Sequence, residues 1–577
     1  MGALRRGKLG CAVSGLWVCL AALALAAPAH AASGTWERTW GMDVDVIGVT
    51  GFEVCTVAAS CQAGLIGVQG GELSTPEGVA ADGAGNVYVS DLSNKRIQKF
   101  DSAGNFQRAW GKDVVTGGGT GFEVCTAAAS CQAGSTGGLG GELSSPAGVA
   151  ADAAGNVYVA DISNSRIQKF DSAGNFQRAW GKDVDTGGGT DFEVCTVAAS
   201  CKAGSPLGGL GGELVSPDGV AADAAGSVYV ADFSFSNSRI QKFDSAGNFQ
   251  RAWGKDVVTG GGTGFEVCTA AASCKAGAEG GLGGELMSPS GVGVDVAGNV
   301  YVSDQFNHRI QKFDSAGNFQ RAWGKDVDTG GGTGFEICTA PASCKAGLIG
   351  GLGGELNFPE GVAADAAGNV YVSDLSNQRI QKFDSAGNFQ RAWGKDVDVG
   401  GGTGFEICTV AASCKIGSFA TALGGELRTP QDVAADGAGN VYVGDGNSRI
   451  QKFAADPAPS PPPSDGGGTT PPSNEFTIGK LKGKKLTLTV PGAGEVEVTD
   501  AADQSARRAS AAAKKKLLKP SSATASGAGT VTVKLKLTRT AKQKLKQRGK
   551  VKVNAAITFT PTGGPANTEN AKLKLKK

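Results

Sequence analysis

The chain has 577 residues and a formal net charge of +1, and this near-neutral value conceals two oppositely charged parts. Residues 475–577 contain 23 Lys and Arg against 6 Asp and Glu, whereas residues 32–474 contain 29 against 48, and such asymmetry points to different partners for the two parts. The chain has only 2 His, which argues against a zinc centre built from several histidines. No segment after residue 31 approaches ~18 uninterrupted apolar residues, which argues against a transmembrane segment in the mature chain.

The first 31 residues are typical of an export signal. Arg5, Arg6 and Lys8 form a positive start, an apolar stretch follows to about Ala27, and residues 29–31 are an A-x-A cleavage site. A membrane anchor is the alternative, and the cleavage site argues against it. We therefore expect residues 1–31 to be removed and the mature protein to be secreted, extracellular or associated with the envelope of a bacterial cell. In such a compartment disulfides persist.

A long unit recurs six times. Its paired cysteines are spaced 70, 70, 73, 70 and 70 residues apart. In the copy at 144–184, the segments 148–152, 156–161, 166–170 and 176–180 are short and either apolar or alternating, which predicts four strands. D-x-x-G-N after the first strand and D-S-A-G-N after the third predict hairpin loops. Four antiparallel strands per unit, repeated around a ring, predict a β-propeller.

Aromatic residues predict the number of blades and the way the ring closes. Six Tyr share one place in the second strand and six Trp share one place in the fourth. They are Tyr88, Tyr158, Tyr229, Tyr301, Tyr371 and Tyr442, and Trp40, Trp110, Trp180, Trp253, Trp323 and Trp393. Residues 35–41 form a fourth strand without a preceding third, and residues 447–453 a third strand without a following fourth. The N-terminal strand is therefore predicted to complete the last blade, which removes an exposed edge.

These residues carry a family resemblance. The pattern P-x-G-V-A-x-D-x-x-G-N-V-Y-V-x-D-x-x-N-x-R-I-Q-K-F resembles the NHL repeat over about 32–455. The resemblance implies an NHL-type six-bladed propeller over 32–454 in an all-β chain. Relatives of this fold include RNA-binding and scaffolding modules, sensor domains, and lyases or lactonases, so it does not decide the function. An insert of about thirty residues after each Trp-Gly, with a cysteine pair, departs from ordinary NHL repeats.

The region after the ring divides into a linker and a basic domain. Residues 455–474 are rich in Pro, Gly and Ser, which predicts a semi-rigid linker. In residues 475–577, four segments alternate with Lys outward, which predicts a small β-sandwich-like domain. Residues 540–549 indicate a short helix, with Thr540 as its N-cap and Gly549 beyond its end. The Lys-rich surface favours an anionic cell-envelope polymer as partner, whereas export and the acidic ring argue against nucleic acid. A merely solvated surface is the alternative.

The repeated cysteines are best explained as disulfides local to each insert. Zinc would need four ligands or two with His, and each unit supplies only two cysteines. A redox couple is usually C-x-x-C beside a helix N-terminus, whereas this spacing is C-x5-C. The loop of about seven residues predicts a stabilisation of about 2.4 kcal/mol, confined to its own insert. The pairs are Cys55–Cys61, Cys125–Cys131, Cys195–Cys201, Cys268–Cys274, Cys338–Cys344 and Cys408–Cys414.

Other chemical motifs are interpreted as structural. His308 occupies a loop position that holds Lys95, Ser165, Ser238, Gln378 and Ser448 in the other copies, so we expect a tolerant surface site rather than a catalytic one. The Asp that ends each first strand is predicted to cap a turn. The Asp that ends each second strand is predicted to pair with Arg.

Metal and phosphate sites have weak support in the sequence, and no cofactor is predicted. Asp326 and Asp328, with their counterparts in most copies, suit a glycine-rich turn, with calcium as the alternative. The TGGGTG run lacks the Lys and Ser/Thr of a phosphate loop. A lactonase-type site would need unlike carboxylates and amides that converge on the axis, and the sequence reveals no such set.

Differences between the copies indicate where a ligand binds. The strands barely change, whereas residues around the Pro of the first strand vary, on the face that is expected to carry the inserts. The candidate binding residues are Ser74, Glu77, Asp218, Met287, Asn357, Glu360, Arg428 and Gln431. No catalytic or metal-ligating residue is predicted. We expect an exported, non-enzymatic binding or scaffold propeller that recognises a protein or a glycan, with neutral drift of these loops as the alternative. A hydrolase or lyase that acts at the axial pocket is the second hypothesis for the function.

Overall fold

The computed structural model describes residues 34–419, 422–455, 476–500, 517–525, 528–561 and 567–576. The chain divides into two compact units, residues 1–459 and 460–577, and each is described by itself. The predicted signal at 1–31, and the predicted linker beyond Ala455, lie outside the described residues. No helix in the described ranges is long and apolar enough to cross a membrane.

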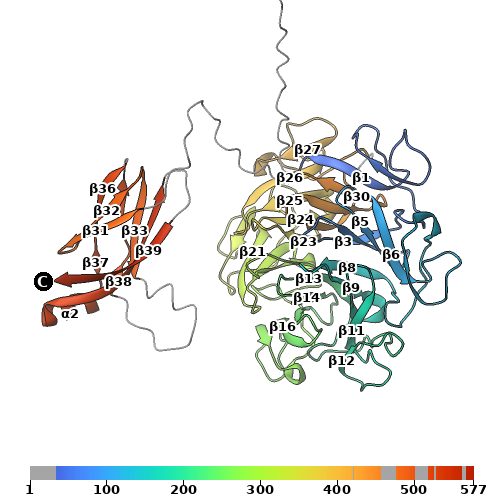
Figure 1. The fold of residues 1–577 in the computed structure, drawn as a ribbon, viewed down its shortest axis with the longest axis horizontal. Coiled ribbons are helices and arrows are strands. Elements are labelled where there is room, and N and C mark those ends of the chain that lie inside the picture. Colours follow the sequence, from blue (N-terminus) through green and yellow to red (C-terminus); the bar gives the residue numbers. More distant parts are fainter. Residues whose placement is uncertain are drawn as a thin grey trace, which may run out of the picture. The chain divides into compact units, whose positions relative to one another are not determined.

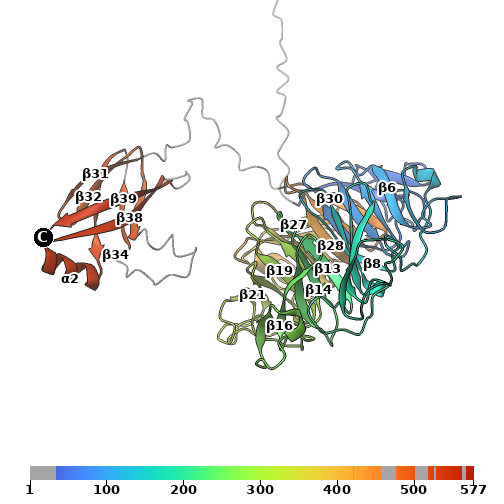
Figure 2. The ribbon, with the colours of Figure 1, turned by 60° about the horizontal axis from the view of Figure 1, so that its bottom comes forward.

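The first unit is a ring of six sheets, which are the blades (Figures 1 and 2). Each inner strand begins at a proline: β3 (Pro76–Ala81), β8 (Pro146–Ala151), β13 (Pro217–Ala222), β18 (Pro289–Val294), β23 (Pro359–Ala364) and β28 (Pro430–Ala435). The second strands are β4 (Val87–Asp91), β9 (Val157–Asp161), β14 (Val228–Asp232), β19 (Val300–Asp304), β24 (Val370–Asp374) and β29 (Val441–Asp445). The third strands are β5 (Arg96–Phe100), β10 (Arg166–Phe170), β15 (Arg239–Phe243), β20 (Arg309–Phe313), β25 (Arg379–Phe383) and β30 (Arg449–Phe453).

Each blade has five strands, which corrects the four that the sequence predicts. The fourth strands are β6 (Phe106–Lys112), β11 (Phe176–Lys182), β16 (Phe249–Lys255), β21 (Phe319–Lys325), β26 (Phe389–Lys395) and β1 (Trp36–Met42). The fifth are β7 (Phe122–Cys125), β12 (Phe192–Cys195), β17 (Phe265–Cys268), β22 (Phe335–Cys338), β27 (Phe405–Cys408) and β2 (Phe52–Cys55). These F-E-V/I-C segments of the inserts alternate, and they pair with the fourth strand, which covers its open edge.

Short 3-10 helices occur in some loops of the ring. Those in the cysteine loops are η1 (Ala128–Ser130), η3 (Ala271–Ser273) and η6 (Ala411–Ser413). Those between second and third strands are η2 (Ile162–Asn164), η4 (Gln305–Asn307) and η5 (Leu375–Asn377).

The ring closes by overlap of the two ends of the propeller, as predicted. The sixth blade has the order β2-β1-β30-β29-β28, so two N-terminal strands complete three C-terminal ones. Trp40 of β1 lies opposite Ile450 of β30. The closing blade therefore has the same strand order as the other five.

The hydrophobic core lies between adjacent blades. Second and third strands are buried along their whole length because a neighbouring sheet covers each face. Trp110 of the first blade (β3–β7) packs on Phe170 of the second (β8–β12), with ring centroids 5.9 Å apart. Trp40 and Phe100 have the same separation across the closure. This contact recurs once per blade, and each Tyr packs on the Trp of its own blade, as Tyr88 does on Trp110 with centroids 6.3 Å apart, so both residue types count the blades.

The Asp that ends each first strand caps a turn, as predicted. The Asp82 carboxylate accepts hydrogen bonds from the backbone N–H groups of Ala84 and Asn86, each at 2.9 Å, and from the Tyr88 hydroxyl at 3.0 Å. The same turn recurs in the other blades, so these six carboxylates have a structural role.

The basic domain contains two main sheets and a helix. The first sheet contains β31 (Thr477–Lys482), β32 (Lys485–Val490) and β36 (Gly529–Lys534). The second contains β35 (Ser521–Ala525), β33 (Gly494–Asp500), β38 (Lys550–Pro561) and β39 (Asn567–Lys576), and a small pair contains β34 (Leu518–Lys519) and β37 (Lys536–Leu537). One core that includes Leu488, Val533, Val498 and Val553 joins the two sheets, as a sandwich requires.

The helix of the basic domain is α2 (Arg539–Arg548), and its cap differs from the prediction. Thr538, rather than Thr540, is the N-cap: its hydroxyl accepts a hydrogen bond from the Ala541 N–H at 3.3 Å. Thr540 is already the second helical residue. Gly549 ends the helix with φ 63°, as predicted.

Candidate functional site

One buried arginine in each blade organises the face that carries the inserts. The Arg96 Nε donates to the Asp91 carboxylate at 2.9 Å, and both side chains are fully buried. The Nη atoms of Arg96 donate to the carbonyls of Gln69 and Glu72, in the connection that enters the blade, and of Gln132, beside the cysteine loop. The equivalent pairs are Arg166–Asp161, Arg239–Asp232, Arg309–Asp304, Arg379–Asp374 and Arg449–Asp445. The predicted Asp–Arg pairs are therefore structural, and they hold the inserts in place.

Six disulfides join the cysteines in the predicted pairing. They are Cys55–Cys61, Cys125–Cys131, Cys195–Cys201, Cys268–Cys274, Cys338–Cys344 and Cys408–Cys414. Each closed loop also contacts the connection that enters its blade: the Gly140 N–H donates to the Ala198 carbonyl at 2.9 Å, and the same bond recurs around the ring. The disulfide loops thus support the connections between blades, which corrects the expectation that each tightens only its own insert.

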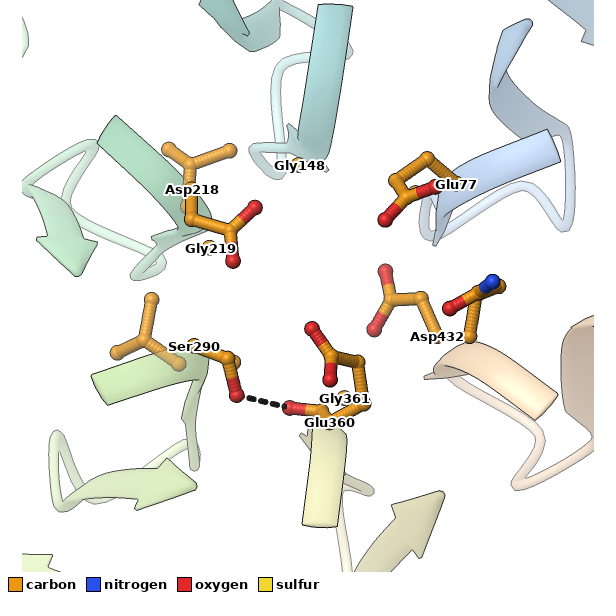
Figure 3. Close-up of a pocket in the computed structure, with 13 residues that line it drawn as sticks. Glu77, Gly148, Asp218, Gly219, Ser290, Glu360, Gly361 and Asp432 are labelled. Carbon is orange, nitrogen blue, oxygen red and sulfur yellow. Dashed lines mark hydrogen bonds between the residues drawn. The ribbon is translucent and has the colours of Figure 1, made fainter. Parts of the chain in front are cut away.

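Four carboxylates from four blades converge on a pocket at the axis of the ring (Figure 3). They belong to Glu77 of β3, Asp218 of β13, Glu360 of β23 and Asp432 of β28. Their residues lie at the beginning of the inner strands, where the connections from the inserts enter. The expectation that no unlike polar residues converge on the axis is therefore wrong, because an acidic set does so. Ser290 and Gln431 also line this axial pocket.

The pocket contains unlike residues because the residue after the strand-opening proline differs in every blade except the first and fifth. A glycine follows it in five blades, and the backbone of the next blade leaves no room for a β-carbon there, as at Gly219, where the Ser290 carbonyl would overlap it. The sixth blade has Asp432 instead. Beside this position, the second strand has Ser90 in the first blade, whose hydroxyl accepts a hydrogen bond from the Gly78 N–H, and Gly444 in the sixth.

The four carboxylates differ in their partners. The Val79 N–H donates to Asp432 Oδ2 at 2.9 Å, and the Gln305 amide donates to Glu360 Oε2. Among the described residues, no donor lies within hydrogen-bond distance of the Glu77 or Asp218 carboxylate. Farther along the axis, the wall consists mainly of Val and Ala from the inner strands, around a second cavity of about 120 Å³. The acidic pocket therefore lies where the inner strands begin, and a second cavity between the same inner strands lies beside it.

These surroundings favour protonation of the acidic set. Burial, together with the negative charges of Glu77 and Asp432, raises the pKa of Asp218 to about 7. Burial also raises the pKa of Asp432 to about 7, although the Val79 and Val433 N–H groups oppose this effect. The pKa of Glu360 is raised by burial and by the other three carboxylates, and that of Glu77 by burial. The set therefore cannot be fully ionised at neutral pH without a compensating positive charge.

The size of the axial pocket limits what it can hold. Its volume of about 40 Å³ is room for about three water molecules, whereas pockets for drug-sized ligands have about 300–1,000 Å³. Among the described residues, no three His, Cys, Asp or Glu side chains are close enough together to chelate one metal ion. A small cationic group that is contacted from several sides fits the volume and the charge.

The predicted binding residues separate into two groups. Glu77, Asp218, Glu360 and Gln431 line the axial pocket. The other four do not line this pocket, because they lie two residues before the proline. Their backbone N–H groups donate to the buried Asp of the Asp–Arg pair. These four are Ser74, Met287, Asn357 and Arg428. Sequence reasoning missed Asp432, and it did not include Ser290 among the candidate binding residues. The replacement of glycine by Asp432 in one copy is the signal that could have found it.

His308 is not at a tolerant surface site, which corrects the prediction. It is half-buried, its Nδ1 accepts a hydrogen bond from the Phe358 N–H of the next blade at 3.2 Å, and its ring packs on Phe358 at 4.6 Å. Gln378 accepts the equivalent bond from Thr429 at 2.7 Å. The side chain at this loop position therefore joins neighbouring blades. Phe306 also packs on Phe358 and on Phe235, with centroids 5.4 and 5.1 Å apart.

The glycine-rich turns use their carboxylates locally. Asp328 Oδ1 accepts a hydrogen bond from the Gly330 N–H at 3.0 Å, and Asp326 forms an ion pair with Lys345 at 2.8 Å. Glu336 accepts from the Asp328 N–H at 2.9 Å. These contacts support the interpretation as a turn.

Comparison with known proteins identifies the repeat. The NHL repeat matches residues 73–100, 143–170, 214–243, 286–313 and 356–383. Two relatives share parts of the ring: the B-box type zinc finger protein ncl-1 of Caenorhabditis elegans, 45% identical over 47 residues, and Protein brain tumor of Drosophila melanogaster, 29% identical over 142 residues. These stretches cover 8% and 21% of this chain, and only 6% and 14% of the two relatives.

Solved structures with a similar arrangement include two enzymes. A streptogramin B lyase is 10% identical, with a TM-score of 0.32 over 68% of this chain and 96% of the other. A gluconolactonase from Xanthomonas campestris is 12% identical, with a TM-score of 0.32 over 74% and 99%. Residues 34–455 therefore form a six-bladed β-propeller that contains five NHL repeats, and its sixth blade has the same strand order as the other five.

Proposed function

We propose that the protein is a non-enzymatic binding propeller that takes a protonated amine of a protein partner into its axial pocket. The observation that carries this proposal is the convergence of four carboxylates, from four blades, on one small cavity. A protonated amine supplies one positive charge and three N–H donors. Within the described part of the chain, the Glu77 and Asp218 carboxylates accept no hydrogen bond, so they can accept those of the amine. A lysine side chain or a chain N-terminus provides this group, and an amino sugar is the alternative source.

The electrostatics of the pocket support a cationic ligand. Entry of a positive charge favours ionisation of Asp218 and Asp432, whose pKa values are raised to about 7. Binding therefore releases protons, and the affinity increases as the pH rises through 7. The inserts around the pocket form the wider contact surface for the partner.

The test is calorimetric titration of the full chain with a lysine-containing peptide and with the same peptide acetylated on every amine. We expect binding of the free-amine peptide only, and a loss of affinity of about tenfold or more in Glu360→Gln. Glu279→Gln, which changes the same charge on an exposed part of an insert, is the matched control. Equal binding of both peptides, or equal affinity of both variants, would show that the pocket does not bind amines.

A second candidate is a hydrolase or lyase that acts at the same pocket. Carboxyl groups with pKa values near 7 are typical of general acid–base catalysis, which favours this candidate. The small volume favours binding of a small group instead. A lactone-hydrolysis assay, with and without divalent cations, distinguishes them: turnover that Asp218→Asn abolishes would support the enzyme.

The proposal also covers the location of the protein and the role of the basic domain. We propose that the protein is exported and that residues 475–577 hold it near an anionic cell envelope. The charge of these residues supports this role. Fractionation of cells that express the full chain, with washes at low and high salt, tests it. Recovery in the soluble fraction at low salt would contradict envelope retention.

A further inference from the structure

The hairpin of β38 and β39 places lysines opposite lysines. In its register, Lys550 pairs with Lys576 and Lys552 with Lys574, while Lys572 lies opposite Asn554. All five lysines are exposed. The alternate residues Val551, Val553, Leu573 and Leu575 point into the core of the domain. The five lysines therefore share the outer face of this sheet, and they are called the lysine ladder below.

The acidic residues of this sheet lie away from the ladder and do not neutralise its positive charge. The exposed Glu495 and Glu497 of the same sheet lie beside Thr560 and Thr558, at the opposite end of β38. Among the described residues, no Asp or Glu forms an ion pair with a ladder lysine. Like charges directly opposite each other destabilise a β-sheet. A surface that has this arrangement is stabilised when a polyanion lies across it.

We infer that the lysine ladder is a binding surface for a linear phosphodiester polymer without bases. This inference rests on the proposed envelope role of residues 475–577 and names its partner class and site. Alternate residues of an antiparallel strand are ~6.8 Å apart, and opposed side chains are ~5 Å apart. Two rows of lysines at this backbone spacing can contact successive phosphates along an extended polyol chain.

The composition of the surface favours this partner over two others. Single-stranded nucleic acid is usually held by exposed aromatic side chains that stack on the bases. The domain has no Trp or Tyr, and its Phe476 and Phe559 are buried against each other, 6.3 Å apart. Insertion into a bilayer needs exposed apolar side chains, and in the described part of this domain no large apolar side chain is exposed. The ladder therefore presents only positive charge to a partner.

The test is titration of the full chain with poly(glycerol phosphate), at salt concentrations from about 50 to 200 mM. We expect Lys552→Gln/Lys574→Gln to weaken binding by about tenfold at the lower salt and to make the salt dependence less steep. Lys485→Gln/Lys534→Gln is the matched control, because these exposed lysines are also cross-strand partners, but on the other sheet. We expect it to weaken binding by less than about threefold.

Three further measurements make the outcome decisive. Lys552→Arg/Lys574→Arg retains the charge and should retain binding, which separates lost charge from a folding defect. Equal losses in both Gln pairs would overturn the ladder as the site, and equal or tighter binding of oligothymidylate with the same number of phosphates would overturn the partner class. Polymer binding by a chain that is nevertheless recovered in the soluble fraction at low salt would contradict envelope retention but not the ladder, so the failures of the two proposals are distinguishable.

Discussion

The carboxylate of Asp432 accepts a hydrogen bond from the backbone N–H of Val79 at 2.9 Å, across 353 positions of the sequence. Asp432 is the third residue of the inner strand of the sixth blade, and Val79 lies in that of the first. The bond therefore closes the ring at the axis, while the pairing of β1 with β30 closes it farther out. Asp432 therefore contributes both to the axial pocket and to the closure of the propeller.

The stability of the ring should depend on pH through the axial pocket. Burial and the charges of Glu77 and Asp432 raise the pKa of Asp218 to about 7, whereas an unfolded Asp titrates near ~4. The stability that protonation of Asp218 provides is therefore present below pH ~4 and lost as the pH rises through about 7. We expect Asp218→Asn to be more stable than the parent by about 1–3 kcal/mol at pH ~8 and similar to it at pH ~4.

Denaturant unfolding at both pH values measures this difference. Glu279→Gln removes an exposed carboxylate outside the pocket and should leave the pH profile unchanged. A constant difference between Asp218→Asn and the parent across the pH range would contradict the proton linkage.

Removal of a buried arginine should destabilise one blade strongly. Arg166 is fully buried with Asp161, and it also holds the carbonyls of Glu142 and Lys202. Arg166→Met leaves the Asp161 carboxylate buried without its cation, which typically costs about 3–5 kcal/mol. Calorimetric unfolding measures the cost. Asp161→Asn/Arg166→Met removes both charges and should recover part of the loss, and an equal loss in both variants would argue against the ion pair as its cause.

Removal of one disulfide should loosen its loop and the connection beside it. Cys195→Ser/Cys201→Ser opens the loop that contains Ala198, whose carbonyl accepts the Gly140 N–H bond. We expect a loss of about 2.4 kcal/mol in the chain-entropy model. Limited proteolysis followed by mass mapping should reveal faster cleavage near Gly140 as well as within the loop. Cleavage confined to residues 195–201 would mean that the loop does not support the connection.

The hairpin glycines under the tryptophans should not tolerate a side chain. Gly174 has φ +82°, and a β-carbon there would lie 2.8 Å from the Trp110 ring of the preceding blade. We expect Gly174→Ala to destabilise the protein by about 1–3 kcal/mol, because both the backbone and the packing oppose it. Gly83→Ala is the control, since a β-carbon at Gly83 meets nothing within 4 Å. Thermal unfolding that does not separate the two variants would contradict this packing.

The ring was predictable because its determinants are local and repeated. Tyr88 and Trp110 recur once per blade, and the unpaired strands at the two ends of the ring indicate the closure. The fifth strand was missed because a four-residue segment such as Phe122–Cys125 becomes a strand only when the edge of β6 is beside it. The buried role of His308 was missed for a related reason: its partner, Phe358, belongs to the next blade.

The sequence by itself determined the blades, their number, the pairing of the cysteines and the positions that vary. It named Glu77, Asp218 and Glu360 as variable positions on one face but gave no sign that they meet. Only the tertiary structure decided that, because six inner strands bring residues about seventy positions apart to one axis, where burial and mutual repulsion change their chemistry. In the basic domain likewise, alternation indicates outward lysines, but only the register of β38 and β39 opposes them in pairs.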